Sequence, residues 1–418
     1  MKRVILFVLV LLYINLLSAK KIEYNEAENI AVKWMEQVTH KKLRIAPQKA
    51  YFLSSYKSRV SNTKQPYYIF NLDSGGWVIV ADDDINSPIL AYSDKSSIDP
   101  YNLPPQFKWW LENVAKDLRK AKELAKKGIL PRKRVTNKKS IKKAYALTSS
   151  SRELAYATSS GSGVGPLLRT AWGQGRGYNE YCPRDARSIE GNGHVPAGCV
   201  AVAMGQIMNY FAWPPRGVGS NSYIPRSNPQ YGRQSANFGN TSYNWSRPDK
   251  AKVVYHSGVA VNMDYGPYAS GAYITDADSA LRRYFRYTTS GVIRKSSDSD
   301  WDRRLIASLD RGSPVIYQGR GNIVHVFVCD GYKRVSGGYM YHFNWGWNGR
   351  SNGWFRIGGM TPYGNYSFNS NNYAIFNIYP NDPSYGLNVK RVSGSLNLLA
   401  PLLLLIIGFI GVLGNKRK

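Results

Sequence analysis

The sequence predicts an α+β protein in which a small N-terminal unit precedes a larger domain. Residues 25–38 place apolar side chains at helical spacing, residues 67–81 have the pattern of two strands around a turn, and the second half combines a buried helix with alternating strands. The chain has 418 residues, of which 43% are hydrophobic and 13% are aromatic. This composition excludes a disordered chain and a small disulfide scaffold.

The N-terminal residues 1–19 have the features of a secretory signal peptide. Lys2 and Arg3 precede an apolar run from Val4 to Ile14, and the small pair Ser18-Ala19 marks a cleavage site. A retained membrane anchor is the alternative that this pattern leaves open. We therefore expect an exported protein, located outside the cell, at its surface or on the periplasmic face of a bacterial membrane.

Residues 20–130 are expected to form a small α+β unit. Asn25–Val38 has one apolar face and predicts a helix. Tyr67–Leu72 and Trp77–Ala81 flank Asp-Ser-Gly-Gly, which predicts a hairpin. A second helix, rich in Lys and Ala, is expected from Pro105 to Lys127.

Residues 131–165 are basic and then rich in Ser and Gly, which predicts a linker. The net charge of the chain is +29, from 56 Lys and Arg against 27 Asp and Glu. Much of the excess lies between Lys116 and Lys143, and no zinc-finger spacing or RNA-binding aromatic motif accompanies it. Nucleic acid is therefore not an expected partner.

Residues 166–385 are expected to form the larger domain and to carry the chemistry. Pro196 and Gly198 interrupt the chain, and apolar residues then recur at helical spacing up to Pro214, so Cys199 lies in the first turn of a buried helix. A helix N-terminus stabilises a thiolate and lowers the pKa of its cysteine. A small buried core residue is the alternative role for Cys199.

A histidine and an asparagine follow Cys199 at strand positions. Residues 321–332 alternate like a strand, with Val324, Val326 and Val328 on one face and His325 on the other, and Asp330-Gly331 is expected to close it. Asn344 ends a second strand. The order Cys, His, Asn is the chain order of papain-like peptidases.

Several longer motifs resemble the streptopain family of cysteine peptidases, whose fold is papain-like. They are AGCVAVAMGQIMNYFAWP from Ala197, HVFVCDGY from His325, NWGWNGRSNGWFRI from Asn344, VNMDYGP from Val261 and WGQGRGYNEYCP from Trp172. They occur in the family's order between about residues 168 and 380. The resemblance implies a papain-like catalytic domain.

The resemblance also implies a role for individual residues. Cys199 would be the nucleophile and His325 the base that takes its proton. Asn344 would orient His325, and Trp345 would cover that contact. Gln174 and the backbone N–H of Cys199 would stabilise the oxyanion.

The segment GGWVIVADDDINSPILAYS, from Gly75 to Ser93, resembles the prosegment of the same family. It implies that residues 20–130 fold on the enzyme as an intramolecular inhibitor. The expected function is a secreted or surface-tethered cysteine endopeptidase that is made as a zymogen and hydrolyses protein substrates through a thioester on Cys199. A papain-like acyl transferase, such as a transglutaminase or ligase, and a catalytically silent binding protein are the alternatives.

Other residues in the larger domain have weaker signals. Asp264, Tyr265 and Gly266 line the substrate cleft or simply form a turn. Cys182 and Cys329 either pair or remain two separate thiols. The five histidines are scattered and no motif binds a phosphate, so we expect neither a metal nor a cofactor.

Residues 393–418 are expected to attach the protein to a membrane or to be processed. Leu396 to Leu413 is almost uninterrupted apolar sequence, and Lys416-Arg417-Lys418 follows it. An apolar segment of about 18 residues can span a thin bilayer as a helix, and a basic tail stays in the cytoplasm. A C-terminal anchor and a bacterial sorting signal that is cut after export are both open.

Overall fold

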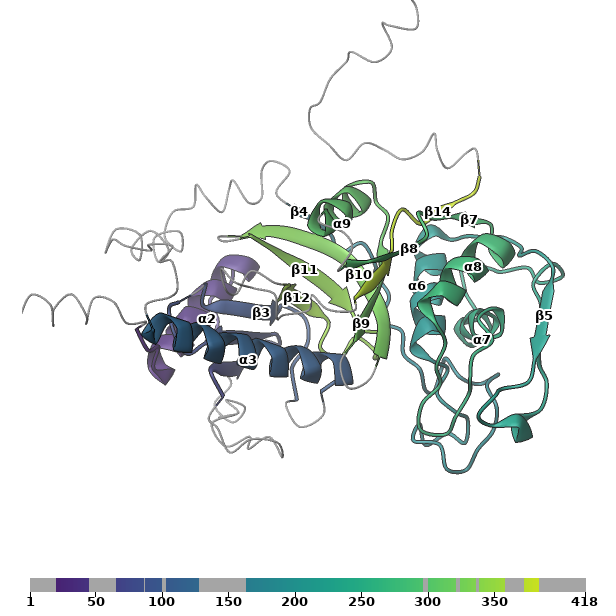
Figure 1. Ribbon diagram of the computed structural model, residues 1–418, viewed down its shortest axis with the longest axis horizontal. Coiled ribbons are helices and arrows are strands. Elements are labelled where there is room, and N and C mark those ends of the chain that lie inside the picture. The colour runs from purple at the N-terminus through teal and green to yellow at the C-terminus, as the bar shows by residue number, and fades with distance from the viewer. Residues whose placement is uncertain are drawn as a thin grey trace, which may run out of the picture.

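A single large β-sheet links the N-terminal unit to the rest of the molecule. The computed structural model describes residues 20–44, 65–85, 87–99, 103–127, 163–295, 300–320, 324–335, 338–357 and 372–382. Within these ranges the sheet has ten strands in the order β1-β2-β3-β12-β11-β10-β9-β13-β8, and β4 pairs with β10. Helices α2 and α3 pack on opposite faces of the sheet, and α6, α7 and α8 lie together beyond strands β9 and β10 (Figure 1).

The N-terminal unit consists of two helices and three strands. Its elements are α2 (Tyr24–Thr39), β1 (Tyr67–Asn71), β2 (Trp77–Ala81), β3 (Ile89–Ser93) and α3 (Pro105–Lys126). Both predicted helices and the predicted hairpin are therefore confirmed. Strand β3 was not predicted as a separate element.

Strand β3 joins the N-terminal unit to the larger domain by direct pairing. It runs antiparallel to β12 (Gly353–Arg356), with Tyr92 opposite Trp354 and Ala91 opposite Phe355. On its other side β3 pairs with β2. Strands from two distant parts of the sequence thus share one continuous hydrogen-bonded sheet.

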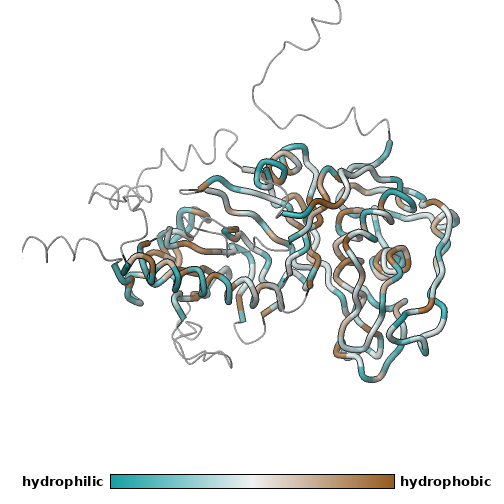
Figure 2. Tube along the Cα trace, in the orientation of Figure 1, coloured by the Kyte–Doolittle hydropathy of each residue, from teal (hydrophilic) through white to brown (hydrophobic). Residues whose placement is uncertain are grey.

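Two hydrophobic cores cover opposite faces of this shared sheet. Successive residues of β2 point alternately into the two cores. Trp77 and Ile79 face the core that includes α3 and α9 (Trp301–Asp310), whereas Val78 and Val80 face α2. Hydrophobic and hydrophilic residues alternate along the strands and helices (Figure 2). Both faces of the sheet are therefore buried.

The helical half of the larger domain packs on a third core. Helix α6 (Cys199–Phe211) is buried along most of its length and contacts α7 (Lys250–Ala260), α8 (Ile274–Tyr284) and β10. The remaining elements are β4 (Gly163–Val164), β5 (Ser220–Tyr223), a 3-10 helix (Pro229–Tyr231), β6 (Gln234–Asn237), β7 (Tyr287–Thr288), β8 (Val292–Arg294), β9 (Val315–Arg320), β10 (Val324–Val335), β11 (Gly338–Asn344), β13 (Tyr373–Ile375) and β14 (Tyr379–Pro380).

Strand β10 is longer than the sequence predicts. Its side chains alternate as expected, with Val326 and Val328 toward α6 and Phe327 toward the opposite core. Asp330-Gly331 does not close the strand but forms a bulge, after which β10 continues to Val335. The bulge persists because the buried Asp330 carboxylate accepts hydrogen bonds from the backbone N–H of Leu168 and from the His342 ring.

Several predicted segments lie outside the described residues. These are the signal peptide, most of the linker and the apolar C-terminal segment. The last residues of the predicted linker, Gly163–Val164, form β4 and pair with Tyr332 and Lys333. Among the helices in the described ranges, none combines the length and the apolar character that crossing a bilayer requires.

Candidate active site

Cys199 is the first residue of α6, and the backbone before it fixes its position. Gly198 has φ +92°, a conformation that favours glycine, and a Cβ atom there would lie 2.6 Å from the sulfur of Met263. Residue 198 can therefore only be glycine without a shift of the core. The Cys199 side chain is half-buried, and its thiol is free.

The Cys199 thiol is electrostatically prepared to ionise. Burial raises its pKa, but the charge of His325, a hydrogen bond from His325, and hydrogen bonds from the backbone N–H groups of Val326 and Val200 lower it by more. The net effect is a pKa below the ordinary value for cysteine. The predicted pair of Cys199 and His325 is therefore brought together by α6 and β10.

His325 is held by a backbone carbonyl. Its Nε2 atom lies 2.9 Å from the Trp345 oxygen, and its ring stacks on Phe327 and meets Trp347 edge-on. A carbonyl oxygen can only accept, so Nε2 carries a proton and donates it. Nδ1 is therefore the ring nitrogen left for the Cys199 sulfur.

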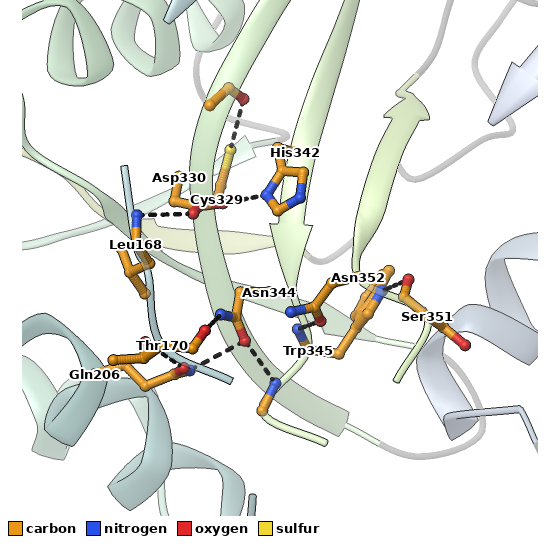
Figure 3. A network of polar contacts seen from close by, with 12 residues as sticks. Leu168, Thr170, Gln206, Cys329, Asp330, His342, Asn344, Trp345, Ser351 and Asn352 are labelled. Carbon is orange, nitrogen blue, oxygen red and sulfur yellow. Dashed lines mark hydrogen bonds and ion pairs between the residues drawn. The ribbon is translucent and has the colours of Figure 1, made fainter. Parts of the chain in front are cut away.

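Asn344 does not make the predicted contact with His325. Its Oδ1 atom accepts from the Gln206 side chain and from the Gly346 N–H, both at 3.2 Å, and its Nδ2 donates to the Thr170 carbonyl at 2.8 Å. The direct acceptor for His325 is the adjacent Trp345 carbonyl. Both amide atoms of Asn344 bond other groups, and one of these, the Gly346 N–H, belongs to the turn that includes Trp345 (Figure 3).

The Trp345 turn is fixed from several sides. The Trp345 N–H donates to Asn352, and its indole N–H donates to the Ser351 carbonyl. The indole is fully buried, and it packs 4.6 Å from Phe327 between ring centroids. Trp345 therefore contributes both the acceptor for His325 and the apolar wall behind it.

Gln174 lies on the segment that leads to the Cys199 helix. Its side chain is half-buried, and its carbonyl accepts the N–H of Ala197 at 2.9 Å, two residues before Cys199. The backbone of Gln174 is thus tied to the start of α6. The Glu190 carboxyl group packs against the neighbouring Gly175, and burial raises its pKa.

The predicted cleft residues form a structural turn. Tyr265 is completely buried, so it is not available to substrate. Asp264 accepts two hydrogen bonds from Ser227, and the Gly266 N–H donates to Ser270. Their signal in the sequence therefore reflects packing behind Gly198, where Met263 and Ser270 lie close.

The other two cysteines are buried and unpaired. Cys182 belongs to the core around α6, whereas Cys329 belongs to the core on the opposite face of the sheet. Burial raises the pKa of Cys182 to about 12 and raises that of Cys329 well above the ordinary value. They are two separate thiols, and of the three cysteines only Cys199 has a lowered pKa.

Sequence reasoning missed Gln206 and the Trp345 carbonyl. Gln206 is fully buried in α6 and joins Thr170, Trp172 and Asn344. A polar residue seven positions after Cys199 on an otherwise apolar helix face was the signal that could have identified it. Within the described residues, no cluster of His, Cys, Asp or Glu could hold a metal ion.

Two family models match the chain in adjacent regions. A model of the peptidase C10 family matches residues 172–355, which include α6 and the His325 strand. A model of the Spi protease inhibitor matches residues 19–118, which include the N-terminal unit up to the middle of α3.

The chain is also similar to several named proteins. Streptopain of Streptococcus pyogenes is 31% identical over 326 residues, which cover 71% of this chain and 74% of streptopain. The thiol protease/hemagglutinin PrtT of Porphyromonas gingivalis is 28% identical over 323 residues, and the chain spans only 34% of its length. Among solved structures, a fragment of prointerpain A from Prevotella intermedia has a TM-score of 0.57 and 27% identity, covering 80% of this chain and 98% of that one.

The match to streptopain, the two family models and the Cys199–His325 pair agree with one another. The chain belongs to the peptidase C10 family, the streptopain family of cysteine endopeptidases, and its N-terminal unit is the inhibitor-like prosegment of that family.

Proposed function

We propose that this chain is an exported, self-inhibited zymogen that hydrolyses peptide bonds of protein substrates through a thioester on Cys199. The observation that carries this proposal is the contact between Cys199 and His325, which lowers the pKa of the thiol at the start of a helix. Membership of a cysteine endopeptidase family supports the reaction class. Export rests on the sequence of residues 1–19.

The first half of the reaction forms the thioester. The Cys199 thiolate attacks the carbonyl carbon of the scissile bond, and the carbonyl oxygen becomes an oxyanion. His325, protonated by the thiol, gives its proton to the leaving amine as the C–N bond breaks. The acyl group remains on the Cys199 sulfur.

The second half of the reaction releases the acid. His325 takes a proton from a water molecule, and the resulting nucleophile attacks the thioester carbon. The C–S bond breaks, and the thiolate returns. The Trp345 carbonyl keeps the His325 ring in the same orientation for both proton transfers because it holds Nε2 at 2.9 Å.

Gln174 and the Cys199 N–H are the proposed oxyanion donors. This proposal is supported by the hydrogen bond between the Gln174 carbonyl and the Ala197 N–H, which ties the Gln174 backbone to the residues just before Cys199. The loss of one such donor typically lowers kcat by about a hundredfold to a thousandfold. We expect that effect for Gln174→Ala.

The prosegment is proposed to inhibit by fixing the wall behind the site. Phe107 of α3 stacks on Trp345 with centroids 6.3 Å apart, and the Trp110 indole donates to the Arg356 carbonyl. The buried Arg356 side chain donates in return to the Ile89 carbonyl and to Ser87. These contacts link the prosegment to the wall behind His325, and we propose that they hold the site in its inactive state.

The proposal is tested by mutating the two reacting groups separately. After removal of the prosegment, Cys199→Ala and His325→Ala should each abolish hydrolysis of denatured casein while the circular dichroism spectrum stays unchanged. Near wild-type turnover in either variant would remove that residue from the mechanism. Product masses distinguish hydrolysis, which adds water to the cut ends, from acyl transfer to an added amine.

A further inference from the structure

Gln206 is a buried amide on the same helix as the nucleophile. It lies seven residues after Cys199, which is about two turns, so both residues point from nearly the same side of α6. Its side chain has no solvent exposure. A buried glutamine needs partners for its amide atoms, and those partners identify what it connects.

The Gln206 amide joins α6 to the segment that leads to Gln174. Its Oε1 atom accepts from the Thr170 hydroxyl at 2.7 Å and from the Trp172 N–H at 3.3 Å. Trp172 lies two residues before Gln174. One carbonyl oxygen therefore sets the distance between the nucleophile helix and the strand-like segment that carries the proposed oxyanion donor.

The other end of the same amide reaches the turn that holds His325. Its Nε2 donates to Asn344 Oδ1 at 3.2 Å, and Asn344 Nδ2 donates back to the Thr170 carbonyl at 2.8 Å. Asn344 Oδ1 also accepts the Gly346 N–H. Gln206, Thr170 and Asn344 thus form a closed ring of hydrogen bonds (Figure 3).

This ring of hydrogen bonds contacts the chain on both sides of Trp345. Asn344 and Gly346 are its chain neighbours, and the carbonyl between them receives His325 Nε2. A Cβ atom at Gly346 would lie 3.1 Å from Val202 of α6, so the turn also approaches the nucleophile helix closely. The direction of the Trp345 carbonyl therefore depends on Gln206 through Asn344.

We propose that Gln206 is a positioning residue that sets the geometry between Cys199 and His325. It does so by linking the nucleophile helix, the Gln174 segment and the Trp345 turn through one amide group. This inference rests on the proposed function, because it assigns Gln206 to that same site. Without the amide, the Trp345 carbonyl should turn away from His325 and lose its hydrogen bond to Nε2. The imidazole would then stabilise the Cys199 thiolate less well, so the pKa of the thiol should rise.

The test compares Gln206→Met with a matched control, Gln234→Met. Gln234 is also buried, and its amide bonds only Tyr231, Gly232 and Tyr255, which are not part of the site. In the full chain, the rate at which iodoacetamide alkylates Cys199 is measured against pH. After the prosegment is removed with a trace of wild-type enzyme, kcat and KM are measured on a peptide substrate.

We expect Gln206→Met to lower kcat about tenfold to a hundredfold with KM changed less than about twofold. Its alkylation profile should move to higher pH by about one unit, because the thiolate loses support. Gln234→Met should change neither kcat nor the pH profile of alkylation, even if its melting temperature falls as much as that of Gln206→Met. An unshifted profile and wild-type kcat in Gln206→Met would overturn the inference, and so would equal losses in both variants.

A second variant keeps the test decisive if Gln206→Met fails to fold. Gln206→Glu fits the same space, and its neutral carboxyl group can accept from Thr170 and donate to Asn344 as the amide does. We expect its kcat relative to wild type to fall as pH rises and the carboxyl group ionises. A constant ratio would contradict the inference. If wild type itself is inactive, the proposed function fails, whereas the alkylation profiles still report on Gln206.

Discussion

The pKa of the Cys199 thiol is lowered by groups from two distant parts of the sequence. Burial alone would keep the thiol protonated, as it does for Cys182 and Cys329. His325 and the N–H groups of Val326 and Val200 reverse that effect for Cys199. The pKa of Cys199 therefore differs in direction from those of Cys182 and Cys329 because of the imidazole and these two N–H groups.

This difference predicts selective alkylation of one thiol. Brief treatment of the native chain with iodoacetamide near neutral pH should label Cys199 and leave Cys182 and Cys329 unlabelled. Cys199 is a thiolate at every pH above its lowered pKa. Its labelling should therefore continue at pH values where an ordinary thiol is protonated, and should decline only when the pH falls below that lowered pKa. Peptide mass mapping measures it. Equal labelling of all three thiols would contradict the assigned environments.

His325→Ala should remove this selectivity. Without the imidazole, burial dominates, and the pH at which Cys199 reacts should rise toward the range of an ordinary or buried thiol. The same alkylation measured from pH 5 to pH 10 checks it. An unchanged profile would mean that the helix N-terminus, not His325, stabilises the thiolate.

Asn344→Ala should cost less activity than Cys199→Ala. Asn344 holds the turn and touches neither sulfur nor imidazole, so we expect kcat/KM to fall about tenfold to a hundredfold, against complete loss for Cys199→Ala. Steady-state kinetics on the processed enzyme measure both. Complete loss in Asn344→Ala, with the fold intact, would give Asn344 a direct role.

The sequence could identify Cys199 and His325 but not the group that orients His325. Residue type and chain order point to a thiol and an imidazole, whereas a backbone carbonyl has no residue type, so Trp345 was assigned only a covering role. The sequence points to Asn344 as the direct partner because it ends a strand before two tryptophans and because the resemblance to the streptopain family implies that role. Asn344 and Trp345 are adjacent in the chain, and only the three-dimensional structure shows that the Trp345 carbonyl, not the Asn344 side chain, bonds His325.

Among the elements, strand β3 determines how the prosegment is attached. It pairs with β12 and so extends the sheet of the catalytic domain. Phe107 and Trp110 of α3 cover the face of this sheet on which Trp345 and Phe355 lie. The prosegment is therefore part of one hydrophobic core with Trp345 and Phe355.

Trp110→Ala in the prosegment should weaken docking. It removes an aromatic contact with Phe355 at 5.2 Å and a hydrogen bond to Arg356, and such a truncation typically costs about 3–5 kcal/mol. Self-processing of the zymogen should then be faster. Gel analysis over time measures it, with the exposed Lys108→Ala on the same helix as control. Identical processing rates would show that α3 does not carry the restraint.

Local elements were predictable where periodicity was strong. Helices α2, α3 and α6 and the β1–β2 hairpin follow their hydrophobic patterns. The bulge at Asp330 resembled a turn because Asp-Gly often closes strands, and buried contacts to Leu168 and His342 decided otherwise. The pairing of β3 with β12 could not be predicted, since no local pattern specifies a partner so distant in sequence.

At the scale of the whole molecule, the shared sheet predicts that a cut in the basic linker does not separate the two parts. The Lys- and Arg-rich sequence from residue 129 to 143 is the expected first site for trypsin. In Cys199→Ala, the clipped prosegment and catalytic domain should still elute together in gel filtration, because they share a core and a β-ladder. Separate elution would contradict the shared core.

We propose that this chain is a cysteine peptidase zymogen that can process itself. To test this, the purified wild-type chain is incubated beside Cys199→Ala under reducing conditions, and both are followed by intact mass. Wild type should shorten to the catalytic domain and then digest denatured casein, while Cys199→Ala stays full length. If both chains stay intact and inert, even after the linker has been clipped with trypsin and with Cys199 refractory to alkylation, the peptidase account is wrong.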